Sequence, residues 1–211
     1  MKTTRNKNPL LPQHPFACQV SGPSKCGKTV LIKKLLTHPD SPFNKVIYYY
    51  SMWQPLYDEM RAALEGSIEF VEGLPTEAPA FDTSLSHCFI FDDLMHEVDK
   101  SPWASKLYTA GCHHQNLSVI SLQQKLFTNR DNRLQCCYLI MFDFPLDRGA
   151  VLPLARKMCP GPGNADRFFE IYKDATGPDH GWLLVDATKK RDPRLRFRRS
   201  WRSCYINATD L

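Results

Sequence analysis

Short apolar runs alternate with amphipathic stretches along the chain from residue 16 onward. The runs rich in β-branched and aromatic residues predict strands at 16–20, 46–50, 67–71, 88–93, 117–122, 137–142, 181–185 and 195–201. Helical spacing of apolar residues predicts helices at 30–36, 54–64, 102–110, 146–158 and 165–175. Ser101 is expected to cap the helix that opens at Pro102. Residues 72–86 contain glycine and prolines and are predicted to form a loop.

The strands are apolar throughout, which is typical of a sheet that is buried on both faces. Helices between such strands favour a mostly parallel arrangement. The pattern therefore predicts one α/β domain over residues 15–202, with helices on both faces of a central sheet. Residues 1–14 have few apolar side chains and are expected to form a flexible basic arm, and residues 203–211 a tail.

The composition favours a protein that works inside a cell. None of the eight cysteines forms a C-x-x-C pair, so we expect free thiols in a reducing compartment rather than a zinc ribbon. Residues 1–8 are basic and polar, without the apolar core of a secretory signal. No apolar stretch approaches the roughly 20 residues that span a bilayer, so we expect no membrane partner.

Basic residues are concentrated near the C-terminus, although the formal net charge is only +5. Residues 189–202 hold eight of the 27 lysines and arginines, against Asp192 as the one acid. Such clustering suits a polyanion such as DNA, and it suits equally an edge strand protected by charge. Arg194, Arg196 and Arg198 alternate with apolar residues, which predicts that they share one face of a strand. That face would line a DNA channel or meet a neighbouring subunit.

The most specific motif lies between the first predicted strand and the first predicted helix. It fits G-x-x-x-x-G-K-[ST] at every fixed position, and its residues are Gly22, Pro23, Ser24, Lys25, Cys26, Gly27, Lys28 and Thr29. The glycines let backbone N–H groups curl around phosphate, and the helix N-terminus adds partial positive charge. Lys28 would reach the β- and γ-phosphates of ATP, and Thr29 would bind Mg²⁺. The alternative interpretation is a turn that carries a stray lysine.

Two acids end the predicted strand at 88–93, as in a Walker B motif. Asp92 would hold Mg²⁺ beside Thr29, and Asp93 would polarise the water that attacks the γ-phosphate. Gln124 follows the next predicted strand, and the carboxyl ends of strands face the ligand in open α/β sheets. Its amide can accept from water and donate to a phosphate oxygen, so it is a candidate sensor. The alternative is a polar residue that opens a loop.

These motifs occur in a recognisable order with several later segments. The later segments are 113–120, 124–127, 154–158, 181–186 and 195–196. Together they resemble the DNA-packaging ATPases of the HerA–FtsK superfamily, over nearly the whole chain from residue 16 to residue 201. The likeness is greatest to the ATPases of Maverick/Polinton elements and adintoviruses, relatives of the poxvirus packaging ATPase. It implies a P-loop NTPase fold of the ASCE type.

The resemblance implies a motor that uses ATP and Mg²⁺ to thread double-stranded DNA into a preformed capsid. A capsid portal or vertex component would be a further partner. The motor would work in the host nucleus or in a cytoplasmic virus factory, or travel with the virion. Such motors are homo-oligomeric rings in which a neighbour supplies an arginine to the γ-phosphate. Counted back from Tyr138, Arg130 matches that arginine and Arg133 competes with it, while Arg148 and Arg156 are further interface candidates.

The predicted catalytic set is Lys28, Asp93, Gln124 and Arg130. A helicase or a conjugation-type DNA pump would share these ATPase residues. A P-loop kinase acting on a small acceptor would need an arginine-rich lid, and such kinases often lack an acid like Asp93. A nucleotide-binding scaffold without hydrolysis is disfavoured by the intact lysine, threonine and aspartates of the motifs.

Overall fold

The computed structural model describes residues 8–108, 115–126, 136–145, 149, 151–188 and 192–205. In this part of the chain the strands are β1 (Ala17–Ser21), β2 (Lys45–Tyr50), β3 (Ile68–Glu72), β4 (His87–Asp92), β5 (Leu117–Gln123), β6 (Tyr138–Phe142), β7 (Trp182–Asp186), β8 (Phe197–Ser200) and β9 (Ser203–Cys204). The helices are α1 (Lys28–Leu36), α2 (Pro55–Ala63), α3 (Met95–Lys100), α4 (Pro102–Lys106), α7 (Val151–Met158), α8 (Asn164–Thr176) and the short 3₁₀ helix η3 (Pro193–Leu195).

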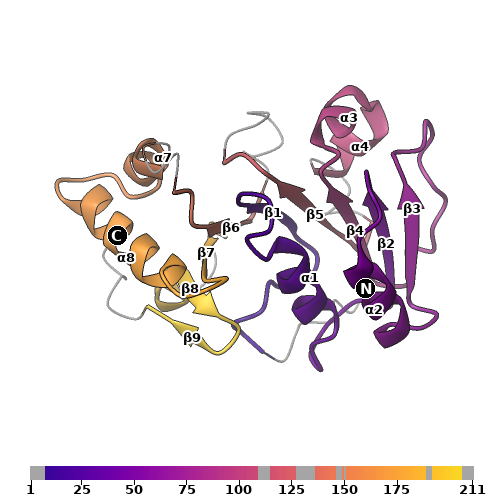
Figure 1. Ribbon diagram of the computed structural model, residues 1–211, viewed down its shortest axis with the longest axis horizontal. Coiled ribbons are helices and arrows are strands. Elements are labelled where there is room, and N and C mark those ends of the chain that lie inside the picture. Colours follow the sequence, from indigo (N-terminus) through magenta and orange to yellow (C-terminus); the bar gives the residue numbers. More distant parts are fainter. Residues whose placement is uncertain are drawn as a thin grey trace.

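The strands form one nine-stranded sheet in the order β3-β2-β4-β5-β1-β6-β7-β8-β9 (Figure 1). Every pair from β3 to β6 in that order is parallel, and β7, β8 and β9 are added antiparallel to their neighbours. The predicted mostly parallel α/β sheet is confirmed. The order places the carboxyl ends of β2, β4, β5 and β1 side by side, which decides where the functional residues meet.

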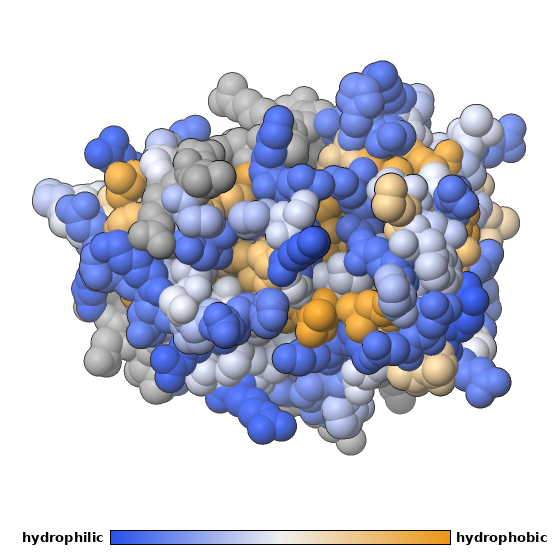
Figure 2. Space-filling model, viewed as in Figure 1, coloured by the Kyte–Doolittle hydropathy of each residue, from blue (hydrophilic) through white to orange (hydrophobic). Residues whose placement is uncertain are grey.

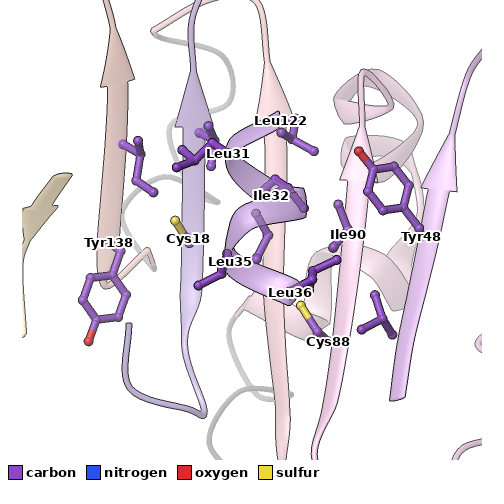
Figure 3. Packing of buried hydrophobic residues seen from close by; sticks show 14 of the residues in the cluster. Cys18, Leu31, Ile32, Leu35, Leu36, Tyr48, Cys88, Ile90, Leu122 and Tyr138 are labelled. Atoms are coloured by element: carbon purple, nitrogen blue, oxygen red, sulfur yellow. The ribbon is translucent and has the colours of Figure 1, made fainter. Parts of the chain in front are cut away.

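Helices cover both faces of the sheet, because alternate strand residues point to opposite sides. On one face, the apolar side of α1 packs against side chains of β6, β1, β5, β4 and β2 (Figure 3). On the other face, α3 and α4 cover the β4–β5 region, and α7 and α8 cover β6 and β7. The buried α1 residues are Leu31, Ile32, Leu35 and Leu36, and each contributes about 1.5–3 kcal/mol through its burial. This packing fixes the P-loop helix on the sheet.

Each of the eight predicted strands is present with its ends shifted by no more than two residues. The helix expected from Pro102 also begins as predicted, since Ser101 Oγ accepts from the backbone N–H of Ala104 at 3.4 Å. Its α-helical part ends at Lys106 and residues 107–108 continue as a π-helix, while the predicted end at 110 lies outside the described residues. Helix α3 and strand β9 were not predicted, and β9 carries the sheet past the expected domain end at 202.

Residues 8–14 pack against the domain, so the expectation of a flexible arm is wrong for them. Leu11 and His14 are buried. The ring nitrogens of His14 lie 2.7 Å from Ser118 Oγ and 2.8 Å from Asn116 Oδ1, at the start of β5. Burial is the main reason that the pKa of His14 is lowered, which favours a neutral imidazole at this position. Residues 1–7 lie outside the described part of the chain.

The predicted row of arginines on one strand face is also wrong. Arg194 lies in η3 and pairs with Asp192, and Arg196 donates to a backbone carbonyl at the end of α7. Arg198 is fully buried and pairs with the buried carboxylate of Asp186. The chain turns through η3 before β8 begins, so the three side chains point to different surroundings. The three basic residues before Asp192 lie outside the described residues.

The face of the molecule seen in Figure 2 is mainly hydrophilic, with hydrophobic side chains in small separate groups. Three large apolar side chains among the described residues are well exposed, namely Val30, Met52 and Trp53. Among these same residues, no helix combines the length and the apolar character needed to cross a bilayer. The cysteines that the structure describes are free thiols.

Candidate nucleotide site

The phosphate-binding motif forms the loop between β1 and α1, and its two glycines are required for different reasons. Gly27 has φ +108°, a conformation that side chains disfavour, and a Cβ there would lie 3.0 Å from His180 Nδ1. A Cβ on Gly22 would lie 2.6 Å from Cys26 Sγ and 2.8 Å from Phe142 Cβ. The loop therefore keeps its shape only with glycine at both positions.

Lys28 is the first residue of α1, and its ammonium lies across the loop. Nζ donates to the backbone carbonyls of Gly22 and Pro23, both at 2.8 Å. The positive charge is thus held over the N-terminus of α1, where the helix dipole also favours an anion. This arrangement suits the binding of a phosphate group.

Asp92 is the last residue of β4 and only 6 % exposed. Its Oδ2 accepts from the hydroxyl of Tyr48 at 2.7 Å and from the hydroxyl of Tyr57 at 2.8 Å. Burial raises the pKa of Asp92 above its ordinary value, while the two hydroxyls and the Lys28 ammonium favour the ionised form. Both tyrosines use the same oxygen, so Oδ1 takes neither of these bonds.

Asp93 follows β4 directly and adopts the left-handed conformation, with φ 57°. Its backbone N–H donates to the carbonyl of Leu122 at 3.2 Å, which ties it to the end of β5. Gln124 Nε2 donates to Asp93 Oδ2 at 2.9 Å. The predicted acid and the predicted sensor amide are therefore in direct contact. Strained backbone of this kind is found preferentially at functional sites.

One pocket of about 580 Å³ brings most of the predicted site residues together. Those that line it are Ser24, Lys25, Gly27, Lys28, Thr29, Asp92, Asp93 and Gln124. Gly22, Pro23 and Cys26 belong to the same loop without lining the pocket. Arg130, and with it Arg133 and Arg148, lies outside the described residues. Arg156 lies on α7, which covers the β6–β7 region of the sheet, and it does not line this pocket.

Sequence reasoning missed several residues that the pocket also contains. Gln54, just before α2, has its Oε1 3.5 Å from the Thr29 hydroxyl. His180, in the turn between α8 and β7, places Nδ1 3.0 Å from the carbonyl oxygen of Cys26. Val30 and Met52 are 39 % and 76 % exposed and add apolar surface to the pocket wall. Val30 directly follows the P-loop motif in α1. No motif marks Met52, Gln54 and His180, because they come from connecting segments distant in sequence.

The residues present fit both ATP and Mg²⁺. The glycine loop, the lysine and the helix N-terminus suit a polyphosphate. The Thr29 hydroxyl and the Asp92 carboxylate are hard oxygen donors of the kind that Mg²⁺ prefers, and both line the pocket.

The fold is that of an α/β P-loop NTPase, with the loop after β1, the two acids at the end of β4, and β5 between these two strands in the sheet. It is similar to the DNA-packaging ATPase B204 from Sulfolobus Turreted Icosahedral Virus, with a TM-score of 0.59 and 13 % identity over 84 % of this chain and 95 % of that chain. It is also similar to the genome packaging NTPase B204 from Sulfolobus turreted icosahedral virus 2 in complex with ATP-γS, with a TM-score of 0.57 and 15 % identity over 84 % and 95 %. The structure of that protein in complex with AMPPCP has a TM-score of 0.56 at 15 % identity over 85 % of this chain and 96 % of that chain.

At these identities the similarity establishes a shared fold. A scan against protein-family models and a search of curated proteins gave no match. The three neighbours named above are described as viral genome-packaging proteins, the broad class that the sequence motifs resemble.

Proposed function

We propose that the chain is an ATP-driven double-stranded DNA translocase that packages a viral or virus-like genome into a capsid. The observation that carries the proposal is the contact of Asp93 with Gln124 in the pocket that the P-loop lines. B204, which shares the fold, is described as a DNA-packaging ATPase. The finer assignment to the HerA–FtsK superfamily, of the Maverick/Polinton–adintovirus type, rests on the sequence motifs. The motor would work in the host nucleus or in a cytoplasmic virus factory.

In this proposal the phosphates of ATP lie in the loop at residues 22–29, with Lys28 against the β- and γ-phosphates. Mg²⁺ held by Thr29 and Asp92 would neutralise charge on the phosphate oxygens. The carboxylate of Asp93 accepts a proton from the attacking water as the water adds to the γ-phosphorus and the bond from the γ-phosphorus to the bridging oxygen breaks, which releases ADP and phosphate. Gln124 orients that carboxylate through its 2.9 Å bond. The apolar side chains of the pocket wall offer a surface for the adenine ring.

Hydrolysis is tested by measuring phosphate release beside the oligomeric state, with and without double-stranded DNA. We expect turnover that rises with DNA and with assembly. Lys28→Ala and Asp93→Asn should abolish it. Lys34→Ala should not, because Lys34 is an exposed lysine on the same helix, outside the pocket. Turnover that persists in both site variants would refute the site. ATPase activity indifferent to DNA at every protein concentration would refute the motor, and phosphate transfer to a small acceptor would indicate a kinase.

The active assembly in this proposal is a homo-oligomeric ring in which Arg130 of one subunit reaches the nucleotide of the next. Asp93 and Gln124 are exposed, so the pocket is open toward a neighbour. Mixing Arg130→Ala subunits with Asp93→Asn subunits should restore part of the activity, because a site is complete wherever an Arg130→Ala subunit provides Asp93 and an Asp93→Asn subunit provides the arginine. The same mixture with Arg133→Ala tests the competing arginine. If neither mixture is active, the proposed arginine in trans is wrong.

A further inference from the structure

Two buried tyrosines from different elements converge on a single oxygen of Asp92. Tyr48 comes from β2 and Tyr57 from α2, and both are fully buried. Their hydroxyls donate to Asp92 Oδ2 at 2.7 and 2.8 Å. In Figure 3 the hydroxyl of Tyr48 points from β2 toward β4, the strand that Asp92 ends. Neither bond is part of the nucleotide-binding motifs.

Aromatic packing fixes both hydroxyls in place. The two rings lie 5.0 Å apart between centroids. Each also packs against Phe70 of β3, at 5.2 Å for Tyr48 and 5.1 Å for Tyr57. A buried ring in such contacts does not rotate away without leaving a cavity. Burial raises the pKa of both tyrosines, so at neutral pH each hydroxyl keeps its proton and acts as a donor.

The two hydrogen bonds restrict the rotation of the Asp92 carboxylate. An aspartate on an open strand end turns about its last bond and can present either oxygen. Here two donors occupy Oδ2, and the carboxylate is held by them in one orientation. Burying a carboxylate is unfavourable, and the two hydroxyl donors offset part of that cost.

Helix α2, which carries Tyr57, also begins beside Thr29, the second predicted metal ligand. Gln54 stands just before α2 and approaches the Thr29 hydroxyl at 3.5 Å, while Tyr57 lies one turn further along. The start of α2 therefore contacts both Thr29 and Asp92. Lys33 of α1 also pairs with Glu59 of α2, so the two helices are in contact.

We propose that Tyr48 and Tyr57 are positioning residues that hold the Asp92 carboxylate in one orientation, with Oδ1 available to Mg²⁺. This inference rests on the proposed function, since it assumes that Asp92 binds the metal that accompanies ATP. Removing a group that orients a metal ligand typically weakens metal affinity by about 10–100-fold. Tyr57→Phe and Tyr48→Phe keep the packed rings and remove only the hydroxyls.

The test measures the binding of a fluorescent ATP analogue as Mg²⁺ is titrated, and again in EDTA. Each single variant should raise the Mg²⁺ concentration at half-effect by about 10-fold, toward the lower end of the range for such groups. Affinity in EDTA should stay within twofold of the unmodified protein. Tyr50→Phe is the matched control, since Tyr50 lies on β2 and packs against Tyr57 at 5.5 Å without donating to Asp92. Thermal melts report whether each variant is folded.

The outcomes separate this inference from the proposed function. If the unmodified protein binds the analogue equally well with and without Mg²⁺, the metal role of Asp92 fails and the proposed chemistry fails with it. If Mg²⁺ matters in the unmodified protein but folded Tyr48→Phe and Tyr57→Phe keep its half-effect concentration within twofold, only the positioning role is overturned. Should Tyr48→Phe fail to fold, Tyr57→Phe alone decides.

Discussion

Arg198→Met tests whether the C-terminal arginines hold the fold together or contact DNA. The side chains of Arg198 and Asp186 are 0 % and 1 % exposed. Methionine keeps much of the apolar stem, so the change mainly removes the charge and its bonds. Removing one partner of a buried ion pair costs about 3–5 kcal/mol, because the other charge is left buried and uncompensated.

The surroundings favour the lower end of that range. Asp186 keeps two donors from Thr188, its hydroxyl and its backbone N–H, the latter at 3.0 Å. The carbonyls of Leu195 and Leu10 lose the guanidinium donors that lie 2.7 and 3.0 Å away, and both residues are partly exposed, so water can replace the donors. We therefore expect a loss of about 3 kcal/mol, a large share of the roughly 5–15 kcal/mol that stabilises a typical domain.

The assay is urea unfolding at neutral pH, followed by circular dichroism. Arg199→Met is the matched control, since that arginine pairs with Asp174 at 3.4 Å while both side chains are more than half exposed. Such an exposed pair contributes less than about 1 kcal/mol, and the control should be nearly neutral. A loss below about 1 kcal/mol in Arg198→Met would refute the argument from burial. If that variant instead lost only DNA stimulation of the ATPase, the channel-lining role would be restored.

Three further changes have defined outcomes. Asp92→Asn should abolish Mg²⁺-dependent ATPase activity and raise the melting temperature. Burial raises the pKa of Asp92, so the stability of the unmodified protein falls as the pH rises from the ordinary pKa of an aspartate toward this raised pKa. The gain in melting temperature should therefore be larger at pH 8 than at pH 4. His180→Ala should weaken the binding of a fluorescent ATP analogue several-fold and change the free energy of unfolding by less than about 0.5 kcal/mol, since the side chain is exposed. Gly27→Ala should abolish that binding, and adding His180→Ala should not restore it, because the φ of +108° remains unfavourable for alanine.

The part of the site that follows from local sequence could be predicted. The P-loop is a continuous segment, and its setting between a strand and a helix is visible in the apolar pattern. Asp93 and Gln124 were each predicted at the ligand-facing end of a strand, and they meet although they lie 31 positions apart, since both follow parallel strands whose carboxyl ends share one edge of the sheet. The prediction needed only the class of fold and the ends of two strands.

The roles of the buried polar residues could not be predicted, because they depend on which strands are neighbours in the sheet. Tyr48 lies within an aromatic strand that reads as core, and its polar role appears only because β2 pairs with β4 in the register that sets Tyr50 against Asp92. Tyr57 follows the apolar spacing of a helix and gives no sign of a hydroxyl bond. Arg198 reads as an exposed charge in an alternating strand, and nothing local reveals that β7 brings the buried Asp186 to it.

Most of the pocket lies on one side of β1 in the sheet, and the buried ion pair of Arg198 and Asp186 lies on the other side. The pocket is built from the ends of β2, β4, β5 and β1, and among the described residues on the far side of β1 only His180 joins it. The buried pair of Arg198 and Asp186 lies on that far side, in the antiparallel extension. Changes at sites that share no partner act nearly independently. Arg198→Met should therefore lower stability without moving the Mg²⁺ half-effect concentration, and Tyr57→Phe should move that concentration in both backgrounds by the same factor. A factor that changes between the two backgrounds would show that the two halves of the sheet are coupled.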